Sequence, residues 1–145
     1  MMTSAKISEE KRAIYDQITT LENLAQIRSF IGKNAVEFGV VEGIVDDFIL
    51  AVDEAVTNIL VHGYKRSAGP VKIEIVHKNK LLQVYVQDQA APFDPTKAPS
   101  PDLTSPLERR PFGGLGVYFI RKAVDRLIYR PLPVGGNELL MEKDL

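Results

Sequence analysis

Two neighbouring stretches of the chain alternate apolar and polar residues, and this period of two constrains the fold more than any other feature. The stretches are residues 71–75 and 82–87, and Lys78, Asn79 and Lys80 lie between them. Successive side chains of a β-strand point to opposite faces, so each stretch predicts a strand with one apolar face. We therefore predict a β-hairpin with one buried face and one solvated face.

Two stretches before the hairpin place apolar residues at three- and four-residue steps, which predicts two amphipathic helices. The first follows a capping box formed by Thr19 and Glu22 and ends at Gly39, where a left-handed C-cap belongs. Its apolar residues are Leu24, Ile27, Phe30, Ile31, Ala35 and Phe38. The second helix runs from Val41 to about His62, with a buried stripe of Ile44, Phe48, Val52, Ala55, Val56 and Ile59.

The composition changes after Phe93, because six of the nine prolines lie between Pro92 and Pro111 and no periodicity survives there. A connection as long as residues 94–112 inside one domain is typical of a functional lid or a linker. It ends at a glycine-rich stretch, residues 113–116, which opens a predicted third helix. Residues 127–129 and 138–141 then read as two short strands around a Gly135-Gly136-Asn137 turn, whereas residues 9–18 fit no single pattern.

Length and composition exclude several classes of protein. A chain of 145 residues with 45% hydrophobic residues predicts one globular domain, residues 1–145. The net charge of −1 gives no electrostatic case for binding nucleic acid. The absence of cysteine excludes disulfides, thiolate nucleophiles and cysteine-ligated zinc. Apolar runs of about four residues are too short to span a membrane, and the start lacks a signal peptide, so we expect a cytoplasmic protein.

Glu54 and Asn58 form the first group of residues that could carry chemistry. Four residues apart on the second predicted helix, they lie on one face, and His62 lies one turn further along. An asparagine oxygen is a hard ligand that suits Mg²⁺, and a nearby glutamate can accept a proton. The alternative interpretation is a solvated helix face.

Asp88 and the glycine-rich stretch form two further candidates. Asp88 ends the second hairpin strand and could accept a hydrogen bond from the amine of an adenine, although such residues usually bond their own turn. Glycines before a helix let backbone amides approach an anion, but they also form ordinary turns. Arg109 and Arg110 lie close by in the sequence and could reach phosphates or be a solvated basic pair.

The order of these segments resembles that of a known group, the stand-alone anti-sigma-factor serine kinases of the histidine-kinase-like (GHKL) ATPase superfamily. Residues 51–58, followed by residues 62–64, are similar to the N-box of that group almost position by position. Residues 88–95 resemble its first glycine box, and residues 113–125 resemble its second. Residues 20–24 are similar to the start of its first helix.

The resemblance covers about residues 12–143 and implies an α+β fold. The fold it implies is a two-layer α/β sandwich, with a mixed, mostly antiparallel sheet, helices on one face and residues 94–112 as a flexible ATP lid. It further implies that Asn58 ligates Mg²⁺, Glu54 acts as the general base, Asp88 reads adenine, and Gly114 and Gly116 present amides to the phosphates of ATP or ADP. The other implied nucleotide-binding residues are Ala90, Phe93, Arg109, Arg110, Gly113 and Leu115.

Ala90 departs from the pattern of the group, whose members usually have glycine two positions after the adenine-binding aspartate. The extra methyl group could narrow the pocket or forbid a positive φ, and either effect would weaken ATP binding.

The implied partners are a STAS-type anti-anti-sigma protein, which would be phosphorylated, a sigma factor, and a second copy of the chain, without nucleic acid or membrane. Three functional hypotheses follow. The first is a serine/threonine kinase that is also an anti-sigma factor. The second is a partner-switch module without kinase activity, which Ala90 favours. The third is a histidine-kinase catalytic domain or another phosphotransferase of the same fold, which is disfavoured because we expect no room in the chain for a dimerising helical hairpin with an acceptor histidine.

Overall fold

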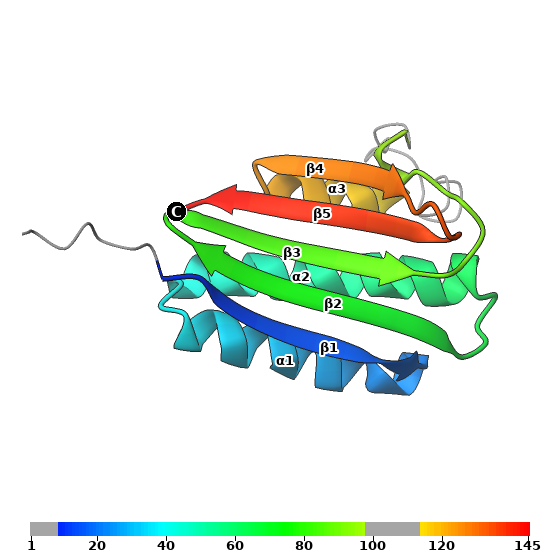
Figure 1. Cartoon of the computed structure of the whole chain (residues 1–145), viewed down its shortest axis with the longest axis horizontal. Helices are drawn as coiled ribbons and strands as arrows, with labels where there is room; N and C mark the ends of the chain where they lie inside the picture. Colours follow the sequence, from blue (N-terminus) through cyan, green and yellow to red (C-terminus); the bar gives the residue numbers. More distant parts are fainter. Residues whose placement is uncertain (1–8, 98–113) are drawn as a thin grey trace, which may run out of the picture.

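The computed structural model describes residues 9–97 and 114–145, which form one sheet with α-helices on one of its faces (Figure 1). The strands are β1 (Lys11–Thr19), β2 (Gly69–Lys78), β3 (Leu81–Asp88), β4 (Arg126–Pro131) and β5 (Asn137–Asp144). The α-helices are α1 (Leu24–Glu37), α2 (Glu42–Asn58) and α3 (Gly114–Ala123), with 3-10 turns at Leu21–Asn23 and Pro95–Lys97 and a π-helical turn at Ile59–Gly63. The predicted α+β sandwich is confirmed.

The five strands lie in the order β1-β2-β3-β5-β4, and every pairing among them is antiparallel. The sheet is therefore fully antiparallel in the described residues, where we predicted a mixed, mostly antiparallel one. The predicted hairpin is β2–β3. The stretch that fitted no pattern, residues 9–18, lies largely in the edge strand β1, whose single strand neighbour is β2.

Helix α1 ends as predicted but begins differently. Gly39 has a φ of +88°, and the amides of Gly39 and Val40 bond back to Val36 and Ala35 in a Schellman arrangement. At the start, the predicted capping box of Thr19 and Glu22 is wrong by one residue. Thr19 closes β1 with its buried hydroxyl bonded to Tyr15, so the cap passes to Thr20, whose amide donates to Asn23 Oδ1 at 2.8 Å.

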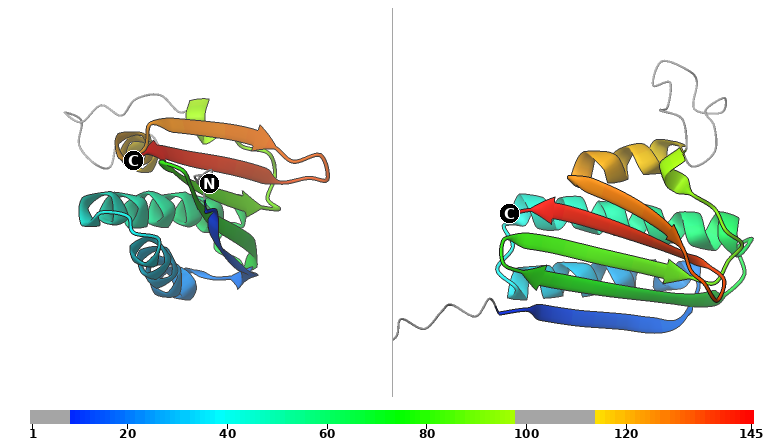
Figure 2. Two further views of the ribbon diagram at one scale, coloured as in Figure 1. Left: turned by 60° about the vertical axis from the view of Figure 1, so that its left-hand side comes forward. Right: turned by 45° about the horizontal axis from the view of Figure 1, so that its top comes forward.

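Helix α2 lies between α1 and α3 and contributes the largest share of helix residues to the core (Figure 2). Phe48, Val52 and Val56 on its inner face are completely buried against the sheet. The α-helical pattern stops at Asn58, four residues before the predicted end, because the next turn widens into the π-helical turn. A π turn inside or after a helix is frequent at functional sites.

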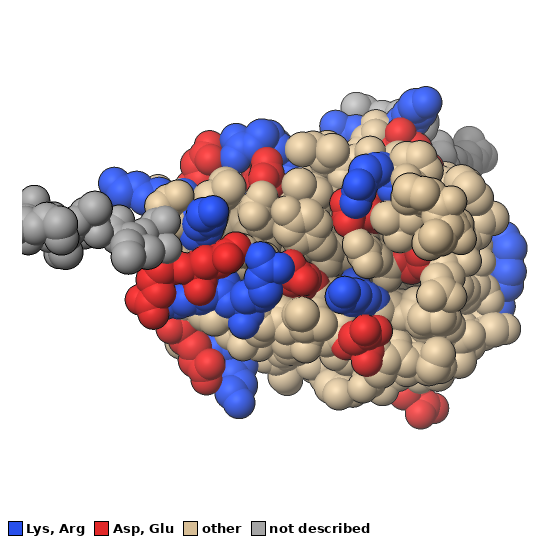
Figure 3. Space-filling view, viewed as in Figure 1, with Lys and Arg blue, Asp and Glu red and all other residues tan. Residues whose placement is uncertain are grey.

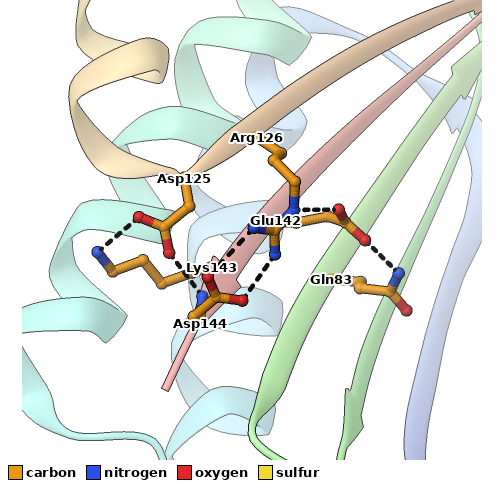
Figure 4. Close-up of polar contacts among 6 residues, drawn as sticks. All are labelled: Gln83, Asp125, Arg126, Glu142, Lys143 and Asp144. Atoms are coloured by element: carbon orange, nitrogen blue, oxygen red, sulfur yellow. Dashed lines mark hydrogen bonds and ion pairs between the residues drawn. The ribbon is translucent and has the colours of Figure 1, made fainter.

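The opposite face of the sheet carries no helix and mixes acidic and basic side chains (Figure 3). At one end, Arg126 bonds Glu142 and Asp144, both at 2.7 Å, and Asp125 accepts the amide of Asp144 at 2.7 Å (Figure 4). These contacts fasten the connection from α3 to β4 onto β5.

No helix in the described part of the chain is long and apolar enough to cross a bilayer.

Candidate functional site

A cavity of about 490 Å³ lies between the end of α2, the first half of α3 and the ends of β3 and β5. Its walls are mainly apolar and carry a few converging polar side chains, which is the usual character of a small-molecule site. The polar residues that line it are Asn58, His62, Lys65, Asp88, Tyr129 and Asn137. Two of these, Asn58 and Asp88, were predicted as site residues from the sequence.

Asp88 lies at one end of the cavity with 5% of its surface exposed. It continues the inward-facing series of β3, after Val84 and Val86, so its carboxyl group points toward the helix layer. Burial raises the pKa of Asp88, and hydrogen bonds from Asn137 and from the amide of Ala90 partly oppose that rise. Both bonds end on Oδ1, and no residue in the described segments bonds Oδ2. A carboxylate oxygen thus remains available to a ligand.

Asn137 holds this end of the cavity together, and the sequence analysis placed it only in a turn. It lies directly opposite Asp88 in the β3–β5 register, and its Nδ2 donates to Asp88 Oδ1 at 2.9 Å. Its Oδ1 accepts the Tyr129 hydroxyl at 2.6 Å and the Phe93 amide at 2.9 Å. The signal that could have found it is the inward-facing parity of β5, which Asn137 shares with Leu139 and Met141.

Asn58 lines the other end of the cavity, and Glu54 lies one helical turn before it, outside the lining residues; both face Gly116 near the start of α3. A Cβ atom built on Gly116 would lie 2.8 Å from Glu54 Oε2 and 3.5 Å from Asn58 Nδ2. Gly116 therefore admits these two side chains because it has none of its own. Burial raises the pKa of Glu54, and the neighbouring charge of Asp53 raises it further. A carboxylate with a raised pKa is better matched to proton transfer near neutral pH.

The predicted Mg²⁺ would be held by Asn58, and the donor chemistry fits. Mg²⁺ prefers oxygen ligands and usually binds through one or two protein side chains together with substrate phosphates and water. Among the described residues, neither the Asn58 amide nor the Glu54 carboxylate has a side-chain hydrogen-bond partner. The described residues contain no group of three or more acidic, histidine or cysteine side chains that would bind a metal independently.

Ala90 and Phe93, two further predicted site residues, both line the cavity. The φ of Ala90 is not positive, so the backbone strain that we considered for this position is absent. Its methyl group rests on the π-helical turn, where a Cβ atom on Gly63 would come within 2.8 Å of it. Phe93 is 60% exposed, and its amide is fixed by Asn137.

Several predicted residues cannot be placed on this geometry. Arg109, Arg110 and Gly113 lie outside the described residues, as does the predicted lid apart from residues 94–97. Gly114 and Leu115 belong to the first turn of α3. The cavity is also lined by His62 and Lys65, two residues to which the prediction assigned no role in the site. Burial, then the charges of Lys65 and Arg66, lower the pKa of His62.

Comparison with known proteins agrees with this arrangement. Residues 19–143 match the histidine kinase-like ATPase domain. This chain belongs to that family. Serine-protein kinase RsbW from Bacillus cereus (strain AH820), Bacillus anthracis (strain A0248) and Bacillus thuringiensis (strain Al Hakam) is 32% identical over 108 residues, which cover 72% of this chain and 68% of each relative. The family predicted from the sequence is thereby confirmed, and protein-serine kinase is the activity named for these relatives.

Proposed function

We propose that the protein is an ATP-dependent serine/threonine protein kinase that acts as an anti-sigma factor. The observation that carries the proposal is the layout of one cavity and of the side chains beside it. A buried carboxylate, one oxygen of which is bonded by no described residue, lines one end, and Asn58 lines the other, where Glu54 lies beside it and both face Gly116 near the start of a helix. This layout suits a purine nucleotide whose base reaches Asp88 and whose phosphates reach the start of α3.

Each part of the cavity has a distinct task in phosphoryl transfer. Asp88 Oδ2 accepts the exocyclic amine of adenine, while Asn137 and the Ala90 amide hold Oδ1 in place. The amino-terminal turn of α3 presents backbone amides and a partial positive charge to the phosphates. Gly116, which has no side chain, leaves room there for Glu54 and Asn58. Asn58 would hold Mg²⁺, which neutralises phosphate charge when bound. Glu54 accepts the proton that leaves the acceptor hydroxyl.

The proposed partners follow from the family. We propose that the acceptor is a serine or threonine of a STAS-type anti-anti-sigma protein, that the chain otherwise sequesters a sigma factor and holds it inactive, and that it pairs with a second copy of itself. A new phosphate adds about −1.5 to −2 charge at neutral pH, which would weaken the complex of the acceptor with an acidic surface. Such a switch would work in the cytoplasm, where ATP and sigma factors are present.

Transfer of labelled γ-phosphate from ATP to candidate STAS-type proteins tests the proposal. Glu54→Gln keeps the size of the side chain and removes its basicity, so we expect transfer to fall by about 100-fold or more, as is typical when a general base is lost. Isothermal titration of the same variant with Mg-ADP should give an unchanged affinity. Asn58→Ala should instead weaken binding of the magnesium nucleotide.

The second candidate function, a nucleotide-binding module without kinase activity, gives a different result in the same experiment. Such a module would bind Mg-ADP but transfer no phosphate to any candidate acceptor. Absence of Mg-ADP binding by the wild type at millimolar nucleotide would refute both functions.

A further inference from the structure

The segment that follows α2 has an unusual backbone. After the π-helical turn, Lys65 and Arg66 both have positive φ angles, +54° and +67°. The amides of Tyr64 and Arg66 bond back to Ile59 and Leu60, each at 2.8 Å. Residues other than glycine adopt this left-handed conformation at an energetic cost, and it persists where surrounding contacts hold it.

Tyr64 provides those contacts. Its hydroxyl donates to the carbonyl of Pro70 at 2.6 Å and accepts the amide of Gln89 at 2.7 Å. Its ring covers Gly69 so closely that a Cβ atom there would lie 2.5 Å from a ring carbon. Burial raises the pKa of Tyr64, so the hydroxyl keeps the proton that it donates. One side chain thus joins the end of α2 to the start of β2 and to the residue after β3.

The residue after β3 that Tyr64 holds, Gln89, is the immediate neighbour of Asp88. The turn of Asp88, Gln89 and Ala90 is attached to the end of α2 at two points, the Tyr64 hydroxyl on the Gln89 amide and the Ala90 methyl on Gly63. Asn58 directly precedes the π-helical turn. The distance between the base-reading carboxylate and the metal-ligating amide is therefore set through this attachment.

We propose that Tyr64 is a positioning residue for adenine recognition, because its hydroxyl fixes the Asp88 turn relative to the end of α2. This inference rests on the proposed function. Tyr64 is not among the residues that line the cavity, so it acts through Asp88 and not by contact with the nucleotide.

The test compares two nucleotides in the wild type and in Tyr64→Phe, which removes only the hydroxyl group. Inosine diphosphate carries a carbonyl where ADP has the exocyclic amine, so it has no N–H group at that position to donate to Asp88. The wild type should therefore prefer ADP, because a site built to bond an N–H group rejects an analogue that lacks it. In Tyr64→Phe, ADP should bind about 3- to 10-fold more weakly, the range of one net hydrogen bond. Inosine diphosphate should bind almost as before, so the preference falls by the same factor.

Tyr85→Phe is the matched control. Tyr85 lies on β3, opposite Glu74 on the face of the sheet that carries no helix, and its hydroxyl has no hydrogen bond within the described residues. The same chemical change there should leave both affinities and their ratio unchanged.

Amide hydrogen exchange at Gln89 gives a second measurement, and its wild-type result does not depend on how well the variant folds. Gln89 is exposed, yet its amide donates to Tyr64, so we expect slow exchange in the wild type and faster exchange in Tyr64→Phe. Fast exchange at Gln89 in the wild type would overturn the inference. So would an unchanged ADP preference in Tyr64→Phe, including equal weakening of both nucleotides. If the wild type binds neither nucleotide, the proposed function itself fails.

Discussion

The contact between Ala90 and Gly63 can be tested by moving one methyl group from one residue to the other. Ala90 is 7% exposed, and a Cβ atom built on Gly63 would lie only 2.8 Å from the methyl carbon of Ala90. Carbon atoms that are not bonded to one another do not approach so closely without a shift of the surroundings. Neither residue has a positive φ, so either can be glycine or alanine without backbone strain.

The structure sets the expected free energies of unfolding. Ala90→Gly removes a buried methyl group, worth about 0.8 kcal/mol, and frees the unfolded chain, so it should destabilise by about 1.5 kcal/mol. Gly63→Ala places a second methyl group in the contact, which should lower the free energy of unfolding by about 1–3 kcal/mol. Alanine also reduces the conformational entropy of the unfolded chain, and this effect offsets about 0.4–1 kcal/mol of that loss. The double variant restores one methyl group to the contact, so it should lie within about 0.5 kcal/mol of the wild type.

Urea denaturation of the four proteins measures this cycle. If the effects of the two single substitutions were additive, the double variant would be about 2.5 kcal/mol less stable than the wild type. Because we expect it to be nearly as stable as the wild type, the expected coupling energy between the two positions is about 2 kcal/mol. ADP titration of the same proteins shows whether the contact also sets the cavity, since the double variant should keep the wild-type affinity. Additive losses in the double variant would refute our account of why alanine is tolerated at position 90.

Three further predictions concern the charged ends of the cavity. Asp88→Asn should raise the free energy of unfolding at neutral pH and weaken ADP binding at least tenfold. Because burial raises the pKa of Asp88 in the folded state, the gain in stability should appear as the pH rises above the ordinary aspartate range and should vanish in acid. Thermal denaturation at a series of pH values measures this gain. Asp53→Asn removes a charge that raises the pKa of Glu54, so the acid limb of the phosphotransfer rate should move to lower pH, whereas an unmoved limb would contradict Glu54 as the base. Gly116→Ala should displace the flexible end of Glu54 and lower the transfer rate about tenfold or more with little change in melting temperature; a fully active variant would show that the close approach is dispensable.

The sequence predicted the elements whose residues follow a clear period or a strong local rule. The β2–β3 alternation fixed which faces are buried, and the four-residue step placed Glu54 and Asn58 on one face. Gly39 marked the end of α1 because its left-handed conformation favours glycine. These signals are local, so a single sequence contains them.

The features that the sequence did not predict depend on contacts between distant residues. Asn137 meets Asp88 only through the β3–β5 register, and Gly136 lies so close that a Cβ atom there would be 2.0 Å from the Asp88 carbonyl. Tyr64, which follows the π-helical turn, bonds Pro70 and Gln89, and no helix pattern reveals these contacts. The capping box begins one residue later than predicted, because the Thr19 hydroxyl is hydrogen-bonded to the Tyr15 hydroxyl.

The position of β5 in the sheet affects when, during synthesis, the chain first becomes able to bind a nucleotide. β5 follows β4 along the chain, yet it lies between β3 and β4 and brings Asn137 to Asp88. A nascent chain on the ribosome can complete α2 and the β2–β3 hairpin well before residues 137–144 are synthesised. Until that strand is inserted, the Asp88 carboxylate lacks the Asn137 amide that holds it, so nucleotide capture should be among the last properties that a growing chain acquires.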